Sequence, residues 1–346
     1  MTDAPLRLRL DSDALTDNWR MLATMSGAAS CGAAIKADGY GLGATEVAMR
    51  LAGAGCRDFF VATWTEAAAL APLGLSISVL HGLRAEDQAL AQSGIARPVL
   101  NSLTQVARWR AMGGGRCDVM VDTGMNRLGL SADEAVSGAL DGLEIDTLMS
   151  HLACADEDAA MNAAQLAAFS ALTGRIAARR YSLANSAGIA LGRDYAFDLT
   201  RPGLALYGGV PRAELSAIRQ VVTPEAQVLQ RRRVCAGETI GYNATYRAPA
   251  DTEVAILNIG YADGYFRGFS GKAHAVRGDV ALPVLGRVSM DLIAICVDAA
   301  SDLTEGDWVS LGYDLPDAAS LSGMSQYELL TGLGARFDRH WISPAG

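Results

Sequence analysis

The stretch Ala33-Ala34-Ile35-Lys36-Ala37-Asp38-Gly39-Tyr40-Gly41-Leu42-Gly43 shows the end of a strand, a turn and the approach to a helix. Its lysine is one of only two in the 346 residues, the other being Lys272, so positive charge alone does not explain its place. An amine can lose its proton and form an imine, and burial favours that state. The glycines permit a tight turn before a helix N-terminus that would attract an anion. We predict an imine-forming lysine beside an anion seat; the alternative is a solvent-directed lysine beside an ordinary turn.

Strand and helix patterns alternate around this stretch. Eight candidate strands cover residues 32–36, 58–62, 76–81, 95–101, 117–122, 145–151, 180–184 and 196–200. Helical patterns between them include 45–52, 65–71, 86–91, 104–112, 132–140 and 159–178. Such alternation is typical of an α/β protein, either a (β/α)₈ barrel or a doubly wound sheet. Eight units in so few residues favour the TIM-type (β/α)₈ barrel.

The pattern changes near residues 211–224. Short alternating runs follow at 227–234, 254–259, 273–276 and 292–297, with one helix expected at 326–333. We predict a barrel over 11–220 and a separate mainly-β C-terminal domain over 221–346. The alternating residues 5–10 predict a strand that packs on the second domain, and Ser12 or Asp13 is the expected cap of a helix that runs to Met25.

Composition excludes several classes of protein. The net charge of −9 and the pI near 5.0, with scattered arginines, disfavour a nucleic-acid partner. The six cysteines are far apart, which predicts reduced, buried thiols in a cytoplasmic protein, and the four dispersed histidines predict no metal site. No apolar run is long enough to span a membrane, so no membrane association is expected.

Polar residues collect where the predicted strands end, which in a barrel is the catalytic face. They are Lys36, the segment 122–127, His151, the pair Asn185-Ser186 and the segment 201–203. No pair of carboxylates joins them, which disfavours a glycosidase. His151 could instead be an ordinary strand-end residue and Arg127 a loop cap. Cys154 hints at a thiol nucleophile, but a buried inert cysteine is the simpler interpretation.

The motifs resemble those of bacterial alanine racemase, a pyridoxal-phosphate enzyme of fold type III. The resemblance runs nearly end to end, in family order. It is carried by the segments 35–41, 122–129, 149–156, 183–187, 201–208, 241–242, 260–264, 286–291 and 327–328.

The resemblance implies a role for each matching residue. Lys36 holds pyridoxal 5'-phosphate as an imine and is one of two catalytic bases, and Tyr242 from the partner subunit of a homodimer is the other. Arg201 faces the pyridine nitrogen with His151 beside it, and Arg127 contacts the phenolic oxygen and the substrate carboxylate. Asn185 belongs to the cofactor-binding set, and the phosphate contacts are Tyr40, Ser186, Gly203, Leu204 and Tyr327. Met290 meets the substrate through its amide, and the access corridor contains Tyr261, Arg267, Arg287 and Asp156.

One position departs from the family. Many members carry a carbamylated lysine where this chain has Met120, which cannot be carbamylated. Arg127 therefore needs another partner, such as a carboxylate or a bound chloride, or is held less rigidly.

The expected reaction is interconversion of L- and D-alanine, which needs a base on each face of a planar carbanion. Alternatives are a racemase with broader substrates, a fold-type-III decarboxylase, or a non-catalytic cofactor-binding protein. Tyr242 argues against the decarboxylase, because decarboxylation does not need a base on each face of the substrate. The second domain argues against a non-catalytic cofactor carrier, because such a carrier would consist of a single domain. Wall synthesis and catabolism of D-alanine are both roles that the resemblance allows.

Overall fold

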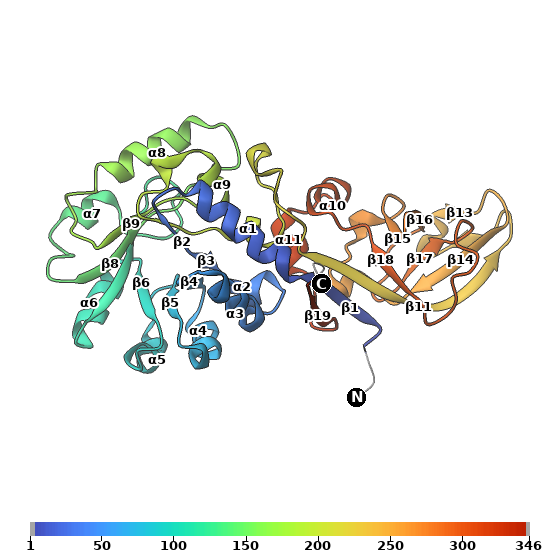
Figure 1. The fold of residues 1–346 in the computed structure, drawn as a ribbon, viewed down its shortest axis with the longest axis horizontal. Helices are drawn as coiled ribbons and strands as arrows, with labels where there is room; N and C mark the ends of the chain where they lie inside the picture. Colours follow the sequence, from blue (N-terminus) through green and yellow to red (C-terminus); the bar gives the residue numbers. More distant parts are fainter. Residues whose placement is uncertain (1–3, 344–346) are drawn as a thin grey trace. The chain divides into compact units, whose positions relative to one another are not determined.

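The computed structural model describes residues 4–343, which divide into two compact units. One unit comprises Leu15–Arg219, and the other combines the described residues up to Ala14 with those from Gln220 onward. The order of the helices and strands along the chain can be followed by colour in Figure 1. Each unit has its own sheet, and each is described by itself below.

Parallel strands form the centre of the unit Leu15–Arg219. Seven of them make one sheet in chain order: β3 (Ala33–Ala34), β4 (Asp58–Val61), β5 (Ser76–Val79), β6 (Arg97–Leu100), β7 (Arg116–Met120), β8 (Glu144–Met149) and β9 (Arg180–Ser182). β10 (Leu199–Thr200) pairs in parallel with β2 (Ser30–Cys31), which precedes β3 along the same strand line. On its other side, the amides of Asp198 and Arg201 donate to the carbonyls of Tyr181 and Ala184 at 3.0 and 2.9 Å. Eight strand positions therefore close into the predicted (β/α)₈ barrel.

Helices connect these strands. They are α1 (Ser12–Met25), α2 (Lys36–Tyr40), α3 (Ala44–Ala54), α4 (Trp64–Leu70), α5 (Gln88–Gln92), α6 (Leu103–Ala111), α7 (Ala132–Val136), α8 (Ala160–Ser170) and α9 (Ser186–Ala190). The predictions for 132–140 and 159–178 were too long: α7 ends at Val136 and α8 at Ser170, and Gly138 and Gly174 beyond those ends have φ of 88° and 80°, outside the right-handed helical region. The predicted cap of α1 was also wrong: the Asp11 carboxylate accepts the Ala14 N–H at 2.7 Å.

The other unit is built on a mainly antiparallel sheet. Its strands are β1 (Leu6–Asp11), β11 (Val222–Val234), β14 (Thr252–Leu257), β15 (His274–Arg277), β16 (Val280–Leu285), β17 (Ile293–Cys296), β18 (Trp308–Leu311) and β19 (Asp338–Ile342). The short strands β12 (Thr239–Ile240) and β13 (Tyr246–Arg247) form a separate two-stranded sheet. The order is β14-β17-β16-β15-β18-β11-β1-β19, and β14 also pairs with the second half of β11. The helix predicted at 326–333 is present as α11 (Gln326–Thr331), and a second helix that the sequence did not predict, α10 (Leu315–Ser322), precedes it and ends before Gly323, which has φ 75°.

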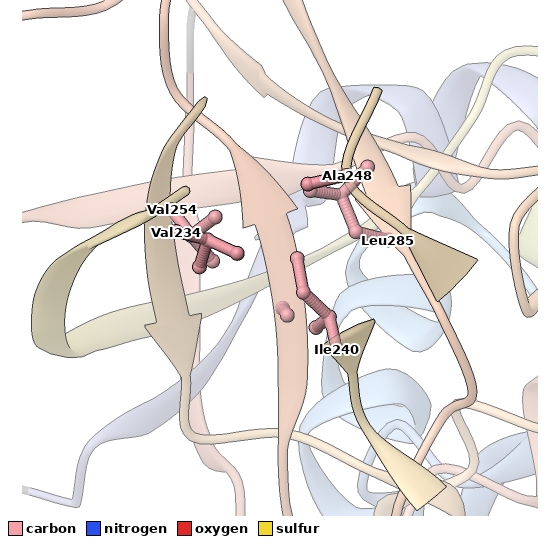
Figure 2. Close-up of a cluster of buried hydrophobic side chains, with 6 residues drawn as sticks. Val234, Ile240, Ala248, Val254 and Leu285 are labelled. Atoms are coloured by element: carbon pink, nitrogen blue, oxygen red, sulfur yellow. The ribbon is translucent and has the colours of Figure 1, made fainter. Parts of the chain in front are cut away.

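The N-terminal strand shows why alternation was a reliable signal. Leu6, Leu8 and Leu10 are buried, while Arg7 and Arg9 alternate with them and form ion pairs with Glu225. A second apolar cluster lies where side chains of the neighbouring strands β11, β14, β16 and β17 meet Ile240 of β12 and Ala248, which follows β13. Figure 2 shows its side chains, which are Val234, Ile240, Ala248, Val254, Leu285 and Ala294. Burial of these faces removes apolar area from water and stabilises the sheet.

Buried charges fill the barrel interior at the amino ends of the strands. Arg180, the first residue of β9, contacts Asp58 at 2.7 Å and Asp146 at 3.0 Å, and Arg97 lies 3.6 Å from Asp118. All three carboxylates are nearly inaccessible to solvent. Each buried charge therefore has a partner, which such burial requires. These groups lie at the strand ends opposite Lys36.

The cysteine prediction holds in part. All six thiols are free, but only Cys31, Cys56 and Cys117 are buried, and Cys235 is exposed. Within residues 4–343, no helix is long and apolar enough to cross a membrane. No group of three or more His, Cys, Asp or Glu side chains in that range could hold a metal ion.

Candidate active site

Lys36 begins a left-handed turn at the carboxyl end of β3. Ala37, Asp38 and Tyr40 have φ between 53° and 56°, which is unfavourable for residues with side chains. The turn is held from outside, because the Ala37 N–H donates to the Glu66 carboxylate at 2.8 Å. Glu66 also completes the capping box that begins α4 with Thr63. The barrel therefore stabilises an unusual backbone that sets the direction of Lys36.

At the predicted anion seat beyond this turn, the Ala44 N–H at the start of α3 donates to the Asp38 carboxylate at 2.8 Å. A carboxylate of the protein itself therefore accepts this N–H of the helix terminus, which favours negative charge.

The Lys36 amine lies in an environment that favours its neutral form. Burial lowers its pKa, and the positive charge of Arg127 lowers it further, while Glu66 acts in the opposite direction. A neutral amine is the form that attacks a carbonyl carbon. This combination is the chemical feature expected of an imine-forming lysine.

Asp122 organises the segment that carries Arg127. Its carboxylate accepts the amides of Gly124 at 2.7 Å and Arg127 at 2.9 Å. Burial would raise the pKa of Asp122, but these and neighbouring amides outweigh that effect and the pKa lies below its usual value. The Arg127 guanidinium is exposed and, among residues 4–343, forms no ion pair. The carboxylate partner considered in place of a carbamate at Met120 is therefore not among these residues.

Arg201 and His151 are held inside the same barrel mouth. The Arg201 guanidinium is buried and donates to the Ser182 hydroxyl and to the Ser150 carbonyl. Burial lowers its pKa to about 10, so it stays charged at neutral pH. Burial, followed by the charges of Arg201, Arg127 and Lys36, lowers the pKa of His151 to about 3. The imidazole is therefore neutral, and the basic side chains of Arg201, Arg127 and Lys36 all lie close enough to act on it.

A second part of the mouth gathers backbone N–H groups. The Ser186 hydroxyl accepts the amides of Gly203 at 2.9 Å and Ala205 at 3.2 Å, and the Asn185 side chain caps α9 through Gly188. A Cβ at residue 203 would lie only 2.2 Å from the Tyr40 hydroxyl. Hydroxyl and amide groups thus converge at a position where only glycine fits. Such an arrangement suits a phosphate group, so the residues present fit the cofactor that the sequence implied. Leu204 follows as the first residue of a short 3₁₀ helix, Leu204–Tyr207.

All but one of the remaining predicted site residues belong to the unit that contains the antiparallel sheet. Tyr242, Met290 and Tyr327 expose 66%, 53% and 46% of their surface, which is unusual for large apolar groups. The amides of Tyr261 and Ala262 donate to the carbonyls of Ser289 and Met290, both at 3.0 Å. The Arg267 guanidinium lies 4.9 Å from the centre of the Tyr261 ring. Arg287 and, in the barrel unit, Asp156 are exposed.

Several supporting residues were missed. Arg336 bridges Asp263 at 2.6 Å and Asp291 at 2.8 Å and so ties together the loops of Tyr261 and Met290. Gln165 of α8 contacts the loops after β7 and β8. The sequence has no signal for either residue, whereas Glu66 was identifiable from its spacing to Thr63.

A lysine of lowered pKa at a barrel mouth, a phosphate-type cradle and a separate antiparallel domain define a class of pyridoxal-phosphate enzyme. Comparison with known proteins agrees. Residues 10–211 match the family model "Alanine racemase, N-terminal domain", and residues 221–341 match "Alanine racemase, C-terminal domain". The chain therefore belongs to the alanine racemase family.

Relatives support this over the whole length. The alanine racemase of Acidiphilium cryptum is 42% identical, covering 96% of this chain and 97% of its own. A catabolic alanine racemase of Agrobacterium fabrum is 44% identical, covering 97% of this chain and 92% of its own. A crystal structure of alanine racemase from Bartonella henselae, with covalently bound pyridoxal phosphate, is 35% identical, covers 97% of this chain and 99% of its own, and superposes with a TM-score of 0.89.

Proposed function

We propose that the protein racemises alanine by a two-base mechanism, with Lys36 and Tyr242 as the bases. Its family makes it an isomerase that acts on alanine with pyridoxal phosphate. The assignment of Lys36 rests above all on one observation, its lowered pKa beside Arg127 at the carboxyl end of β3. When bound, the cofactor supplies an electron sink that makes the α-proton of the amino acid acidic.

The barrel residues then have separate tasks. Lys36 anchors the cofactor and moves the proton on one face of the substrate. Arg201, charged and held by Ser182 and Ser150, donates to the pyridine nitrogen without giving up its proton. His151, neutral beside it, adds no further charge. Arg127 binds the substrate carboxylate and the phenolic oxygen, for which an exposed guanidinium that forms no ion pair with residues 4–343 is suited.

The phosphate contacts and the second base complete the proposal. We assign the phosphate to a set that consists of Tyr40, Asn185, Ser186, Gly203, Leu204 and Tyr327. Tyr242 moves the proton on the opposite face, with Met290 and Tyr261 on the substrate side. We place the cofactor-binding barrel at 11–220 and the domain that supplies Tyr242 at 221–346. A cytoplasmic homodimer in which Tyr242 comes from the partner subunit agrees with the exposure of that tyrosine.

Reduction with borohydride tests the central assignment. Reduction of the holoenzyme should fix the cofactor to the peptide that contains Lys36, and Lys36→Arg should abolish both labelling and the conversion of L-alanine to D-alanine. The matched control is Lys272→Arg, which alters the only other lysine and should change neither. A label on Lys272 would refute the assignment. Release of carbon dioxide instead of D-alanine would indicate the decarboxylase.

A further inference from the structure

Gln165 is a fully buried amide in the middle of α8. Its Nε2 donates to the His151 carbonyl at 2.9 Å and to the Thr123 hydroxyl at 3.2 Å. Its Oε1 accepts the Ala153 N–H at 2.9 Å. One side chain therefore satisfies three polar groups of two different loops, and its own amide is fully buried, so loss of these partners would leave buried polar atoms unsatisfied.

The two loops are those that carry Arg127 and His151. Thr123 lies in the segment that Asp122 organises, and it also shares a 2.8 Å hydrogen bond with the Ser150 hydroxyl. Ser150 is held from the barrel interior, because its carbonyl accepts from Arg201. The backbone at residues 150–151 is thus fixed by Arg201 on one side and by Gln165 on the other.

We propose that Gln165 is a positioning residue that sets the Arg127 and His151 segments relative to each other, a proposal that rests on the function assigned above to those two side chains. Only an amide can donate to a carbonyl and a hydroxyl while accepting from a peptide N–H. Methionine has a similar length but cannot replace these hydrogen bonds. Because Arg127 forms no ion pair of its own among residues 4–343, the anchoring of its loop decides where its guanidinium lies.

The chain contains a matched control in Gln105 of α6. Its Oε1 accepts the Asn101 N–H at 2.9 Å, and its Nε2 donates to the His81 carbonyl at 3.3 Å. It joins the ends of β5 and β6 in the same way, but those ends carry none of the proposed site residues. Substitution of either glutamine removes hydrogen bonds between a helix and the neighbouring loops. Only the substitution of Gln165 is expected to affect the proposed active site.

The test compares Gln165→Met with Gln105→Met in the full-length holoenzyme. Amide hydrogen exchange should become faster at residues 122–127 and 150–156 in Gln165→Met, and only near residues 81 and 101 in Gln105→Met. For alanine, kcat/KM should fall by about tenfold to a hundredfold in Gln165→Met, with a raised KM because Arg127 is misplaced. It should keep its wild-type value in Gln105→Met.

Gln165→Glu keeps the test informative if Gln165→Met does not fold. An ionised carboxylate still accepts from Ala153 but cannot donate to the His151 carbonyl, so exchange and KM should again rise. Unchanged exchange at both segments, or an equal loss of kcat/KM in Gln105→Met, would overturn the positioning role. Failure of the wild-type protein to racemise alanine would instead refute the proposed function, while the exchange comparison would still decide whether Gln165 holds the loops.

Discussion

Gly203→Ala is a sharp test of the phosphate cradle. The added Cβ would lie 2.2 Å from the Tyr40 hydroxyl and 2.9 Å from the ring carbon that bears it. Ordinary contact begins at 3.4 Å, so the hydroxyl and the Cβ must move apart by 1.2 Å. Tyr40 is buried and stacked on Tyr207 with ring centres 4.6 Å apart, which leaves its ring little freedom to move.

Overpacking of this kind costs about 1–3 kcal/mol of unfolding free energy. We expect that loss in chemical denaturation of Gly203→Ala, together with weaker binding of pyridoxal phosphate in a titration followed by absorbance. The control is Gly53→Ala in α3, where an added Cβ meets nothing within 4 Å. That change should raise the unfolding free energy by up to about 1 kcal/mol, because alanine favours the helix.

The double variant Gly203→Ala with Tyr40→Phe separates the two effects. Removal of the hydroxyl relieves the shortest contact, so part of the stability should return, while cofactor affinity should stay low because a phosphate contact is lost. If Gly203→Ala unfolds and binds the cofactor like the wild type, the close approach of Tyr40 to residue 203 is incorrect, and with it the proposed cradle.

Four further outcomes follow from the site. Activity should be indifferent to removal of carbon dioxide, because Met120 cannot be carbamylated; loss that bicarbonate reverses would contradict this. Arg201→Glu should protonate the pyridine nitrogen, slow racemisation and produce a long-wavelength absorption band; unchanged spectra would exclude that role. Inactive Lys36→Ala and Tyr242→Phe homodimers, mixed equally, should regain about one quarter of wild-type activity if subunits share sites; exchange without recovery would exclude sharing. The pKa of Asp122 is depressed, so the stability that it contributes should be complete above about pH 5 and be lost as pH falls below about 4. Asp122→Asn should therefore make the unfolding free energy depend less on pH below about pH 5; an unchanged dependence would contradict this.

Local patterns were sufficient for much of the fold. The alternation in residues 6–10 identified β1, and the eight strand runs identified the barrel, because period and residue type report which face of an element is buried. Element ends were less predictable. The alanine-rich stretches at 132–140 and 159–178 favour helix, but in the structure α7 ends at Val136 and α8 at Ser170. Gly138 and Gly174, which follow these ends, adopt a left-handed backbone conformation that the sequence did not reveal.

The sequence by itself determined the family and the chemistry of the site, because a lone lysine, its glycines and the ordered motifs are local features of the chain. Only the tertiary structure showed that Asp38 occupies the expected anion seat, that burial and Arg127 lower the pKa of Lys36, and that Gln165 joins two loops. These properties depend on burial and on distances between residues far apart in sequence. Charge, desolvation and hydrogen bonding act through space, so they become definite only when the barrel has closed.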